Sequence, residues 1–330
     1  PEVDQEWNWS ERYADHNEIR RYLNFVADKF DLRRDISLST KVTSATFDSV
    51  RDRWTVRTDV GLSFEAPFLV TAVGCLSTAN VPDITGIDTF KGDWYHTGHW
   101  PHDGVDLSGK RVGQIGTGST GIQLAPELAA VADQLTVFQR TANYSIPARN
   151  APLTEEFQTE VKKNYRDIRA WAKRTTNGHP FDIRDQSALD VDASERRKIY
   201  EAAWDTGGLR FRAAFRDILS DTQANQTASD FIHSKIRETV KDPATAEILT
   251  PIDHGFATKR PPIDTHYFET FNRDNVSLVD LRATPIKEIT ESGIQTTDKE
   301  HELDVIVFAT GFDAITGSLE ALNIAGTDGP

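Results

Sequence analysis

Three glycines, Gly116, Gly118 and Gly121, constrain this chain most, because of what lies on either side of them. The run 110–115 before them has the composition of a short β-strand, and 122–130 after them is typical of a helix. In such a strand, turn and helix, the first glycine permits a tight turn, the second lets the backbone approach a diphosphate, and the third allows close packing. The helix N-terminus then offers free N–H groups to the phosphates. This context favours a nucleotide site over an ordinary glycine-rich turn.

The end of the next expected strand, 134–139, indicates which dinucleotide would bind. Arg140 and Thr141 follow it, and Arg140 lies 24 positions after Gly116. Proteins that bind NADH place an acidic residue about 20 positions beyond the loop, where it holds the ribose 2′-hydroxyl. A guanidinium suits a 2′-phosphate instead, because arginine presents a planar fork of donors to phosphate oxygens. The sequence therefore predicts NADPH rather than NADH; the alternative is that Arg140 is a solvated surface charge.

A second segment, 90–101, contains one Phe, two His and two Trp within twelve positions. It resembles the fingerprint of the Baeyer–Villiger monooxygenases, F-x-G-x-x-x-H-x-x-x-W followed by Pro or Asp. The fixed positions are matched by Phe90, Gly92, His96, Trp100 and Pro101. Further segments resemble the same family in order and spacing, and within it the phenylacetone, steroid and cyclohexanone monooxygenase branch: 116–123, 137–141, 258–260, 271–276 and 309–313.

The resemblance implies an α/β fold with two dinucleotide-binding, Rossmann-like domains of the flavin monooxygenase type, an incomplete one for FAD and one for NADPH. It also implies a reaction in which NADPH reduces FAD and the reduced flavin captures O2 as a flavin peroxide. That peroxide attacks a small ketone, which becomes an ester or lactone. Because the flavin carries out this chemistry, the protein's tasks are to position groups, stabilise charge and exclude water.

The resemblance assigns roles to individual residues. Arg260 matches the family's active-site arginine, a permanent cation suited to stabilising the anionic peroxyflavin and placing the nicotinamide. Lys259, Arg140 and Thr141 match the set that holds the 2′-phosphate. His96 and Trp100 match positions that join the two domains and matter for their relative movement, and a structural role for His96 is favoured over proton transfer. The remaining expected cofactor-binding residues are Gly116, Thr117, Gly118, Ser119, Thr120, Gly121, Gln123, Ala309, Thr310 and Gly311.

We expect a discontinuous domain arrangement. It consists of the latter part of the FAD domain (1–76), the first part of the NADP domain (77–143), a helical insertion (144–255), the second part of the NADP domain (256–310) and a return into the FAD domain (311–330). Residues 73–74 and 309–311 are expected to connect the two domains. In the insertion, aromatic residues such as Trp204, Phe211 and Phe215 are expected to form a core.

Local patterns give further expectations. Apolar spacing predicts a core-facing helix at 17–30 and a small antiparallel sheet over 36–58. Continuous apolar runs predict buried strands at 68–74 and 303–308. The single cysteine, Cys75, is expected to be a small buried hydrophobe rather than a nucleophile.

Composition excludes several classes of partner. The net charge of −14 disfavours nucleic acid and anionic membranes, because long-range repulsion opposes both. One cysteine excludes an intrachain disulfide and a multi-cysteine metal site, and no metal is expected. No stretch approaches 18 uninterrupted apolar residues, so we expect a cytoplasmic protein without a membrane span.

The chain begins at Pro1 and has no Met, and it lacks both the family's first GxGxxG loop for FAD and the Asp that partners the active-site arginine. We therefore expect an internal fragment that alone neither holds FAD tightly nor turns over. Two other interpretations stay open. One is a related flavin monooxygenase that oxidises nitrogen or sulfur, whose fingerprint ends differently, and the other is a non-catalytic remnant that binds NADPH. The sequence indicates neither the particular ketone nor the oligomeric state.

Overall fold

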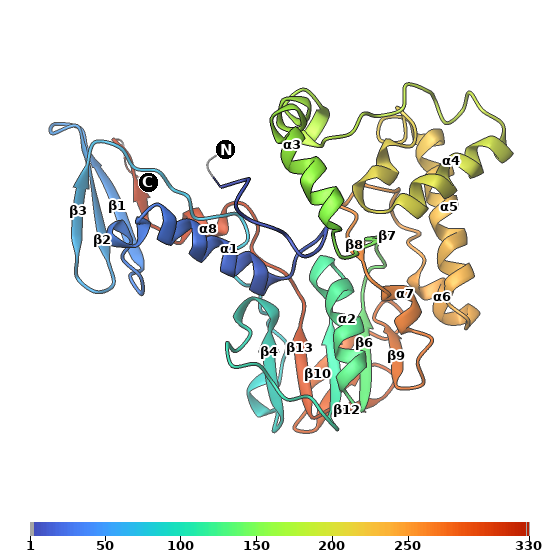
Figure 1. Cartoon of the computed structure of the whole chain (residues 1–330). Coiled ribbons are helices and arrows are strands. Elements are labelled where there is room, and N and C mark those ends of the chain that lie inside the picture. Colours follow the sequence, from blue (N-terminus) through green and yellow to red (C-terminus); the bar gives the residue numbers. More distant parts are fainter. Residues whose placement is uncertain (1–2, 328, 330) are drawn as a thin grey trace.

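The computed structural model describes residues 3–327 and 329, and a parallel sheet forms the centre of its larger part (Figure 1). Among the described residues this sheet has five strands in the order β4-β13-β5-β6-β9. All four neighbouring pairs are parallel, and the strands are β4 (Asp93–His96), β5 (Arg111–Ile115), β6 (Gln134–Gln139), β9 (Val276–Asp280) and β13 (Val305–Phe308). The strands that follow β5 in the chain lie on both sides of it, so the topological switch point of the sheet is at β5. The expected α/β class is confirmed.

Burial explains why these segments form central strands and the helix that covers them. Every residue of β13 is buried, as predicted for the apolar run at 303–308. Helix α2 (Ser119–Val131) follows the glycine loop and buries Ile122, Ala125 and Leu128 at helical spacing. The strand, turn and helix predicted around the glycines therefore form one packed unit.

A group of helices lies beyond the carboxyl end of the sheet, drawn green to orange in Figure 1. Its aromatic core includes Trp204, Phe211 and Phe215, as expected, and the rings of Tyr200 and Phe231 lie 5.3 Å apart within it. Among the described residues no helix combines the length and apolar character that a membrane span requires. The helices are α3 (Glu155–Ala172), α4 (Ala193–Thr206), α5 (Thr222–Thr239), α6 (Pro243–Leu249) and α7 (Tyr267–Thr270), and the strands β7 (Ile146–Pro147) and β8 (Ile263–Asp264) pair beside them.

A smaller sheet stands apart from the larger part, at the left of Figure 1. Its strands β1 (Val42–Asp48), β2 (Arg53–Thr58) and β3 (Ser63–Ala66) are antiparallel, and β14 (Ile324–Ala325) joins β1 in parallel. Helices α1 (His16–Lys29) and α8 (Gly317–Glu320) lie near it. The remaining elements are the antiparallel strands β10 (Ile286–Ile289), β11 (Gly293–Thr296) and β12 (Glu300–Glu302) and short 3₁₀ helices at Leu32–Asp35, Ile87–Thr89, Thr97–His99, Thr176–Gly178 and Gly208–Ala213.

Several expectations for this smaller part were wrong. The helix at 17–30 exists as α1, and its Tyr22 packs against Trp7 and Trp9, with ring centroids 5.4 and 5.0 Å apart. Ile19 and Leu23, however, are 44% and 59% exposed, so only part of the apolar face is covered. The antiparallel sheet begins only at Val42, because 36–40 has no strand partner. The run 68–74 is not a strand, and Phe68 and Val70 are both 84% exposed. Apolar composition alone therefore did not determine burial here.

Two extended segments connect the smaller sheet to the larger part, and they pair with each other. The backbone N–H of Asn80 donates to Gly311 O (3.0 Å), and Asp313 N donates to Thr78 O (2.9 Å). The backbone of Cys75 accepts from Ile315 N at 2.9 Å, but Cys75 is exposed, so its expected burial was wrong. Its place in this connection, rather than in a core strand, explains the exposure.

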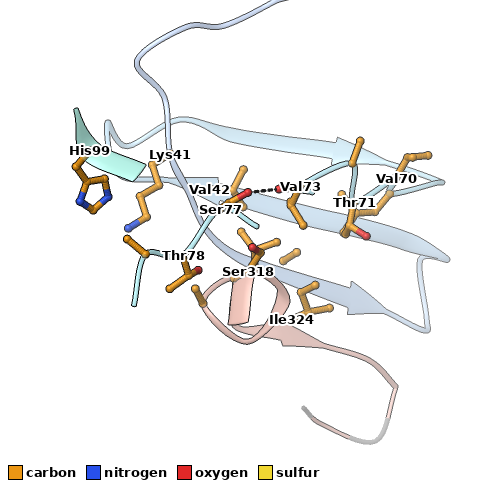
Figure 2. Close-up of a pocket in the computed structure, with 16 residues that line it drawn as sticks. Lys41, Val42, Val70, Thr71, Val73, Ser77, Thr78, His99, Ser318 and Ile324 are labelled. Carbon is orange, nitrogen blue, oxygen red and sulfur yellow. Dashed lines mark hydrogen bonds between the residues drawn. The ribbon is translucent and has the colours of Figure 1, made fainter. Parts of the chain in front are cut away.

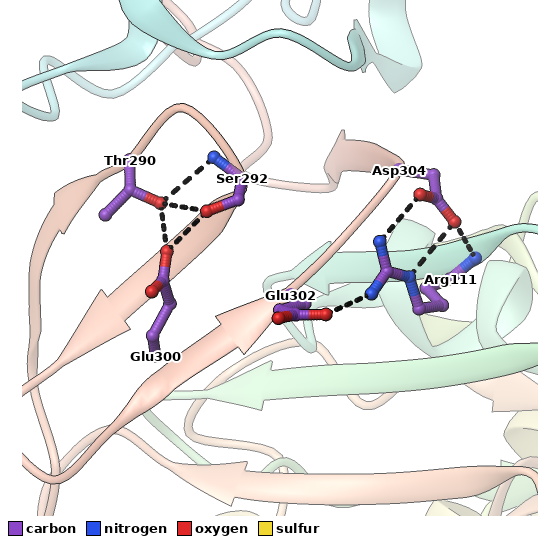
Figure 3. Close-up of polar contacts among 6 residues, drawn as sticks. All are labelled: Arg111, Thr290, Ser292, Glu300, Glu302 and Asp304. Carbon is purple, nitrogen blue, oxygen red and sulfur yellow. Dashed lines mark hydrogen bonds and ion pairs between the residues drawn. The ribbon is translucent and has the colours of Figure 1, made fainter.

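At the amino ends of the central strands an ion-pair network fixes their alignment (Figure 3). Arg111, which begins β5, donates from Nη2 to Asp304 Oδ1 (2.8 Å), from its backbone N to Asp304 Oδ2 (2.8 Å) and from Nη1 to Glu302 Oε2 (2.5 Å). The hydrogen bonds from Arg111 lower the pKa of Asp304 to about 2. Nearby, Glu300 accepts hydrogen bonds from Thr290 (2.5 Å) and Ser292 (2.7 Å), which join the start of β12 to the turn between β10 and β11.

We predict that Asp304→Asn removes an acid-sensitive part of the stability. Because the folded pKa is depressed, the ionised carboxylate stabilises the fold above its ordinary pKa of 3.8, and this contribution is lost as pH falls towards about 2. Urea unfolding between pH 5 and 2 measures it, and the slope of stability against pH should become shallower in the variant. Glu291→Gln, which removes an exposed pair with Lys91, is the control and should leave the slope unchanged. Parallel curves for wild type and Asp304→Asn would contradict the prediction.

Candidate dinucleotide-binding site

The carboxyl ends of β5, β6 and β13 surround a cavity of about 610 Å³. In doubly wound sheets, ligands bind in this position, at the switch point of the strand order. The structure brings eleven of the residues predicted from sequence into the wall of this one cavity. They are Gly116, Thr117, Gly118, Ser119, Thr120, Arg140, Thr141, Lys259, Ala309, Thr310 and Gly311.

The three glycines differ in what surrounds them. Gly116 has φ +108°, and a Cβ there would lie 2.5 Å from Ala309 O, so only glycine lets the loop pass the end of β13. A Cβ on Gly121 would lie 2.2 Å from Gly116 O, which makes this glycine necessary for the tight return into α2. A Cβ on Gly118 would have no described atom of another residue within 4 Å apart from its chain neighbours, and Gly118 lines the cavity. The loop is therefore tightly packed against the protein at Gly116 and Gly121, and at Gly118 its backbone faces open space in which a ligand can lie.

Gln114 holds this loop through hydrogen bonds to its backbone, a role that was not predicted from the sequence. It is fully buried in β5, and its Nε2 donates to the carbonyls of Gly116 and Gly121, both at 3.0 Å. On the cavity side, Thr117 Oγ1 donates to Thr141 O at 3.0 Å, which links the loop to the end of β6. A polar residue within an apolar strand, directly before a glycine loop, was the available signal.

Two cations flank the cavity from different parts of the chain. Arg140 follows β6, and Lys259 lies on the loop after α6. Both are exposed, and neither forms an ion pair with a carboxylate of the part of the chain that the structure describes. Together with the N-terminus of α2, these charges suit an anionic ligand with more than one phosphate.

Asn143 is a second residue of the cavity wall that the sequence reasoning missed. Its Oδ1 is buried and has no hydrogen-bond partner among the described residues. An unsatisfied buried acceptor costs free energy unless a ligand or water donates to it. Its place two positions after Thr141 was the only sequence signal.

Three residues predicted for the site lie outside this wall. Gly121 packs behind the loop, as described above. Gln123 is exposed on α2, and its Nε2 donates to Ile263 O at 3.3 Å, so it ties the helix to β8. Arg260 is exposed beside Lys259 but does not line the cavity.

The fingerprint residues also lie outside the cavity wall. A Cβ on Gly92 would lie 2.3 Å from Asp304 O, so this glycine allows the segment before β4 to approach the start of β13. Phe90 packs against the apolar cluster that contains Ile306 and Phe308. Trp100 packs against Tyr95, with ring centroids 5.5 Å apart, and Pro101 follows it, half-buried.

His96 ends β4 and lies against the connection to the smaller sheet. It is 2% exposed, its Nδ1 accepts a hydrogen bond from Gly98 N (3.0 Å), and its ring meets Phe312 edge-on at 6.0 Å. Burial, and to a lesser degree the nearby His99, lowers the pKa of His96, while backbone groups of Gly311 and Asn80 oppose the shift. A neutral, buried imidazole at this point is suited to packing rather than to proton transfer.

A second cavity, of about 640 Å³, lies beside the smaller sheet (Figure 2). Its lining is mainly apolar, with Val42 on β1, Val70 and Val73 on the extended segment, and Ile324 on β14. Ser77 closes the extended segment through a 2.7 Å hydrogen bond to Val73 O. Lys41 and His99 are the ionisable side chains among its lining residues, and the lining contains no glycine, so it offers no phosphate-binding loop.

Comparison with known proteins gives a consistent result. A model of the flavin-binding monooxygenase-like family matches residues 7–151. Cyclopentanone 1,2-monooxygenase of Comamonas sp. (strain NCIMB 9872) is 41% identical over 100% of this chain and 60% of its own length. Phenazine N-monooxygenase PhzNO1 of Lysobacter antibioticus is 44% identical over 99% of this chain and 61% of its own length. The structure of an oxidised steroid monooxygenase bound to NADP is 55% identical, with a TM-score of 0.96 over 100% of this chain and 63% of that one. The chain thus spans about three fifths of the length of its relatives.

We predict that Gly121→Ala disturbs the loop. Alanine is favoured over glycine within a helix by about 1 kcal/mol, but the added Cβ would lie 2.2 Å from Gly116 O, and such overpacking costs about 1–3 kcal/mol. We therefore expect a melting temperature lower by a few degrees and weaker NADP+ binding in a calorimetric titration. Gly118→Ala, whose Cβ meets only open space, is the matched control for the fold: it should melt like wild type and still weaken NADP+. A Gly121→Ala protein with unchanged stability and affinity would rule this out.

Proposed function

Since the chain belongs to the flavin-binding monooxygenase-like family, we propose that its cavity binds NADPH and that the protein, with FAD, inserts one oxygen atom of O2 beside a ketone carbonyl. The observation that carries this proposal is the convergence of eleven family-matched residues on one cavity at the switch point of the sheet. A relative of 41% identity that is named for a cyclic ketone supports the substrate class. When bound, the flavin supplies the oxygen-transfer chemistry.

The cavity fits a dinucleotide with a 2′-phosphate. Its diphosphate would rest on the open backbone at Gly118 and the free N–H groups that begin α2. Arg140, Thr141 and Lys259 would hold the 2′-phosphate, since both cations lack an ion-pair partner among the described residues. Asn143 Oδ1 offers an additional acceptor to the ligand.

We propose Arg260 as the catalytic cation and the fingerprint as a joint. Arg260 lies beside Lys259 on an irregular loop, exposed to solvent, so its guanidinium can serve a charge that develops next to the nicotinamide. His96 and Trp100 pack where the connecting segments leave the central sheet, which suits a role in the relative placement of the two parts. FAD is assigned to no named residue, because the second cavity lacks a phosphate-binding loop among the described residues.

The domain division remains our proposal and follows the layout of the sheets: 1–76 and 311–330 in the FAD domain, 77–143 and 256–310 in the NADP domain, and 144–255 as a helical insertion. Pairing of β14 with β1 supports the return of the last segment, and the helices α3 to α6 support the insertion.

A small-molecule substrate and O2 are the proposed partners, and a cytoplasmic location is supported by the acidic composition and the single cysteine.

Oxidation of a ring nitrogen is the second candidate function. The phenazine N-monooxygenase is 44% identical to this chain, and the cyclopentanone enzyme is 41% identical, so overall identity does not separate the two reactions. A protein that binds NADPH without turnover is the third.

Turnover of the full reading frame that encodes this chain tests the proposal. The purified protein is supplied with FAD and NADPH, and O2 uptake and products are followed with cyclopentanone and, separately, with phenazine. Lactone formation coupled to NADPH consumption is expected. Phenazine N-oxide without lactone would establish the second candidate, and NADP+ binding with neither product the third.

We predict that Arg140→Ala weakens NADPH much more than NADH. Loss of a charge-assisted contact to phosphate should raise KM for NADPH by about tenfold to a hundredfold and leave KM for NADH nearly unchanged. Arg216→Ala, which removes an exposed arginine of the helical part that pairs with Asp185, is the control and should alter neither. Equal losses for both cofactors would refute the assignment of the 2′-phosphate to the end of β6.

We predict that Arg260→Ala abolishes ketone oxygenation in the full reading frame and slows flavin reduction by NADPH, while NADP+ still binds. The physical reason is the loss of a permanent positive charge beside the reacting groups. Stopped-flow absorbance and product analysis measure the two steps, and Arg260→Lys tests whether any cation suffices. Lactone formation at the wild-type rate in Arg260→Ala would refute a catalytic role.

A further inference from the structure

Arg282 lies next to the candidate site without lining it. Strand β9 ends at Asp280, whose Oδ1 accepts the backbone N–H of Arg282 (2.9 Å), and Leu281 N donates to Gln139 O (2.8 Å). These bonds fix the turn after β9 against the end of β6. Leu281 lines the cavity, whereas Arg282 does not and instead contacts the backbone of Arg140.

The guanidinium of Arg282 bridges two segments. Its Nε donates to the backbone carbonyl of Arg140 at 2.8 Å, and its Nη2 to Asp253 Oδ2 at 2.5 Å. The other carboxylate oxygen of Asp253 meets His254 Nδ1, also at 2.5 Å. The hydrogen bond from His254, and next that from Arg282, lowers the pKa of Asp253, so the bridge is ionic at neutral pH.

The two bridged segments carry the two cations of the cavity. Arg140 is one of these cations, and Asp253 and His254 lie in the loop after α6 that leads to the other, Lys259. This loop is fixed further where the buried Tyr144 hydroxyl donates to His254 O at 3.0 Å. Phe256, which lies between His254 and Lys259, is anchored separately: its N–H donates to Ser229 Oγ (3.1 Å), and its carbonyl accepts from Asn225 Nδ2 (2.8 Å). Arg282 therefore fixes the early part of this loop relative to Arg140, and its contacts are one of the anchors that place the two cations.

We propose that Arg282 is a positioning residue for cofactor choice: by holding Arg140 O and Asp253 together, it sets the spacing of Arg140 and Lys259 around the 2′-phosphate. The proposal rests on the assignment of NADPH to this cavity. An arginine suits the task because its rigid fork donates in two directions at once, which a lysine ammonium on a flexible stem does less well.

A contribution to overall stability is a poor explanation for these contacts. The side chains of Arg282 and Asp253 are 41% and 38% exposed, and ion pairs at that exposure add little to the stability of a fold. The competing explanation is that Arg282 is a third positive charge that attracts the phosphate directly. The two ideas predict opposite changes in NADP+ affinity when Asp253 is removed. Without that carboxylate Arg282 is held less firmly, which weakens binding if Arg282 acts by positioning. Its charge is then also uncompensated, which strengthens binding if Arg282 acts by charge alone.

Calorimetric titration of the chain with NADP+ and with NAD+ tests the proposal, using Arg282→Ala, Arg282→Lys, Asp253→Ala and Arg237→Ala. The last removes an exposed pair with Glu247 on the helical part and is the control. We expect Arg282→Ala to lose about fivefold to tenfold in NADP+ affinity, with NAD+ affinity and melting temperature nearly unchanged. Arg282→Lys should lose almost as much, and Asp253→Ala should also lose NADP+ affinity.

Each other outcome has a defined meaning. A wild-type chain without preference for NADP+ would refute the NADPH assignment itself. If wild type prefers NADP+ and Arg282→Ala keeps that preference, the positioning role is wrong. Full recovery in Arg282→Lys, or tighter NADP+ binding in Asp253→Ala, would show that charge alone matters and would also overturn it. Should Arg282→Ala fail to fold, the Lys and Asp253 variants still decide between the two ideas.

Discussion

The close contact between the glycine loop and the end of β13 is the constraint on which the rest of this structure depends. Gly116 passes Ala309 O so closely that no side chain fits, and Gln114 holds the loop by its carbonyls at Gly116 and Gly121. This contact joins segments that are far apart in sequence. Because it aligns the carboxyl ends of β5 and β13, it also defines the floor of the cavity.

Charge is organised differently at the two ends of the central sheet. At the amino ends, Arg111 is paired with Asp304 and Glu302, and those contacts satisfy the charges within the protein. At the carboxyl ends, Arg140 and Lys259 have no carboxylate partner in the described part of the chain. Paired charges align strands within the protein. Unpaired cations beside a helix N-terminus can instead bind the phosphates of a ligand. Arg282 combines both features: its own charge is paired with Asp253, and it donates a hydrogen bond to the backbone of Arg140, whose charge is unpaired.

The segments around the smaller sheet show that an apolar pattern predicts secondary structure better than it predicts burial. The spacing of Ile19 and Leu23 correctly indicated a helix, and the run 68–74 indicated burial, yet these side chains are largely exposed. Amphipathic spacing reports which face of an element avoids water, but it contains no information on what covers that face. The central strand 303–308 was predicted correctly because both faces of a parallel strand are covered within the same sheet unit.

The sequence by itself determined the strand, turn and helix at 110–130, the helical character of the stretch that contains α3 to α6, and the family that the motifs indicate, because these depend on short-range sterics, periodicity and residue identity. Only the tertiary structure decided that eleven matched residues share one cavity while Gln123 and Arg260 lie outside its wall. It also decided the partners of Gln114, Asn143 and Arg282, for which the local sequence carries almost no signal. Such contacts join chain segments far apart in sequence, and their geometry is set by the packing of the whole sheet.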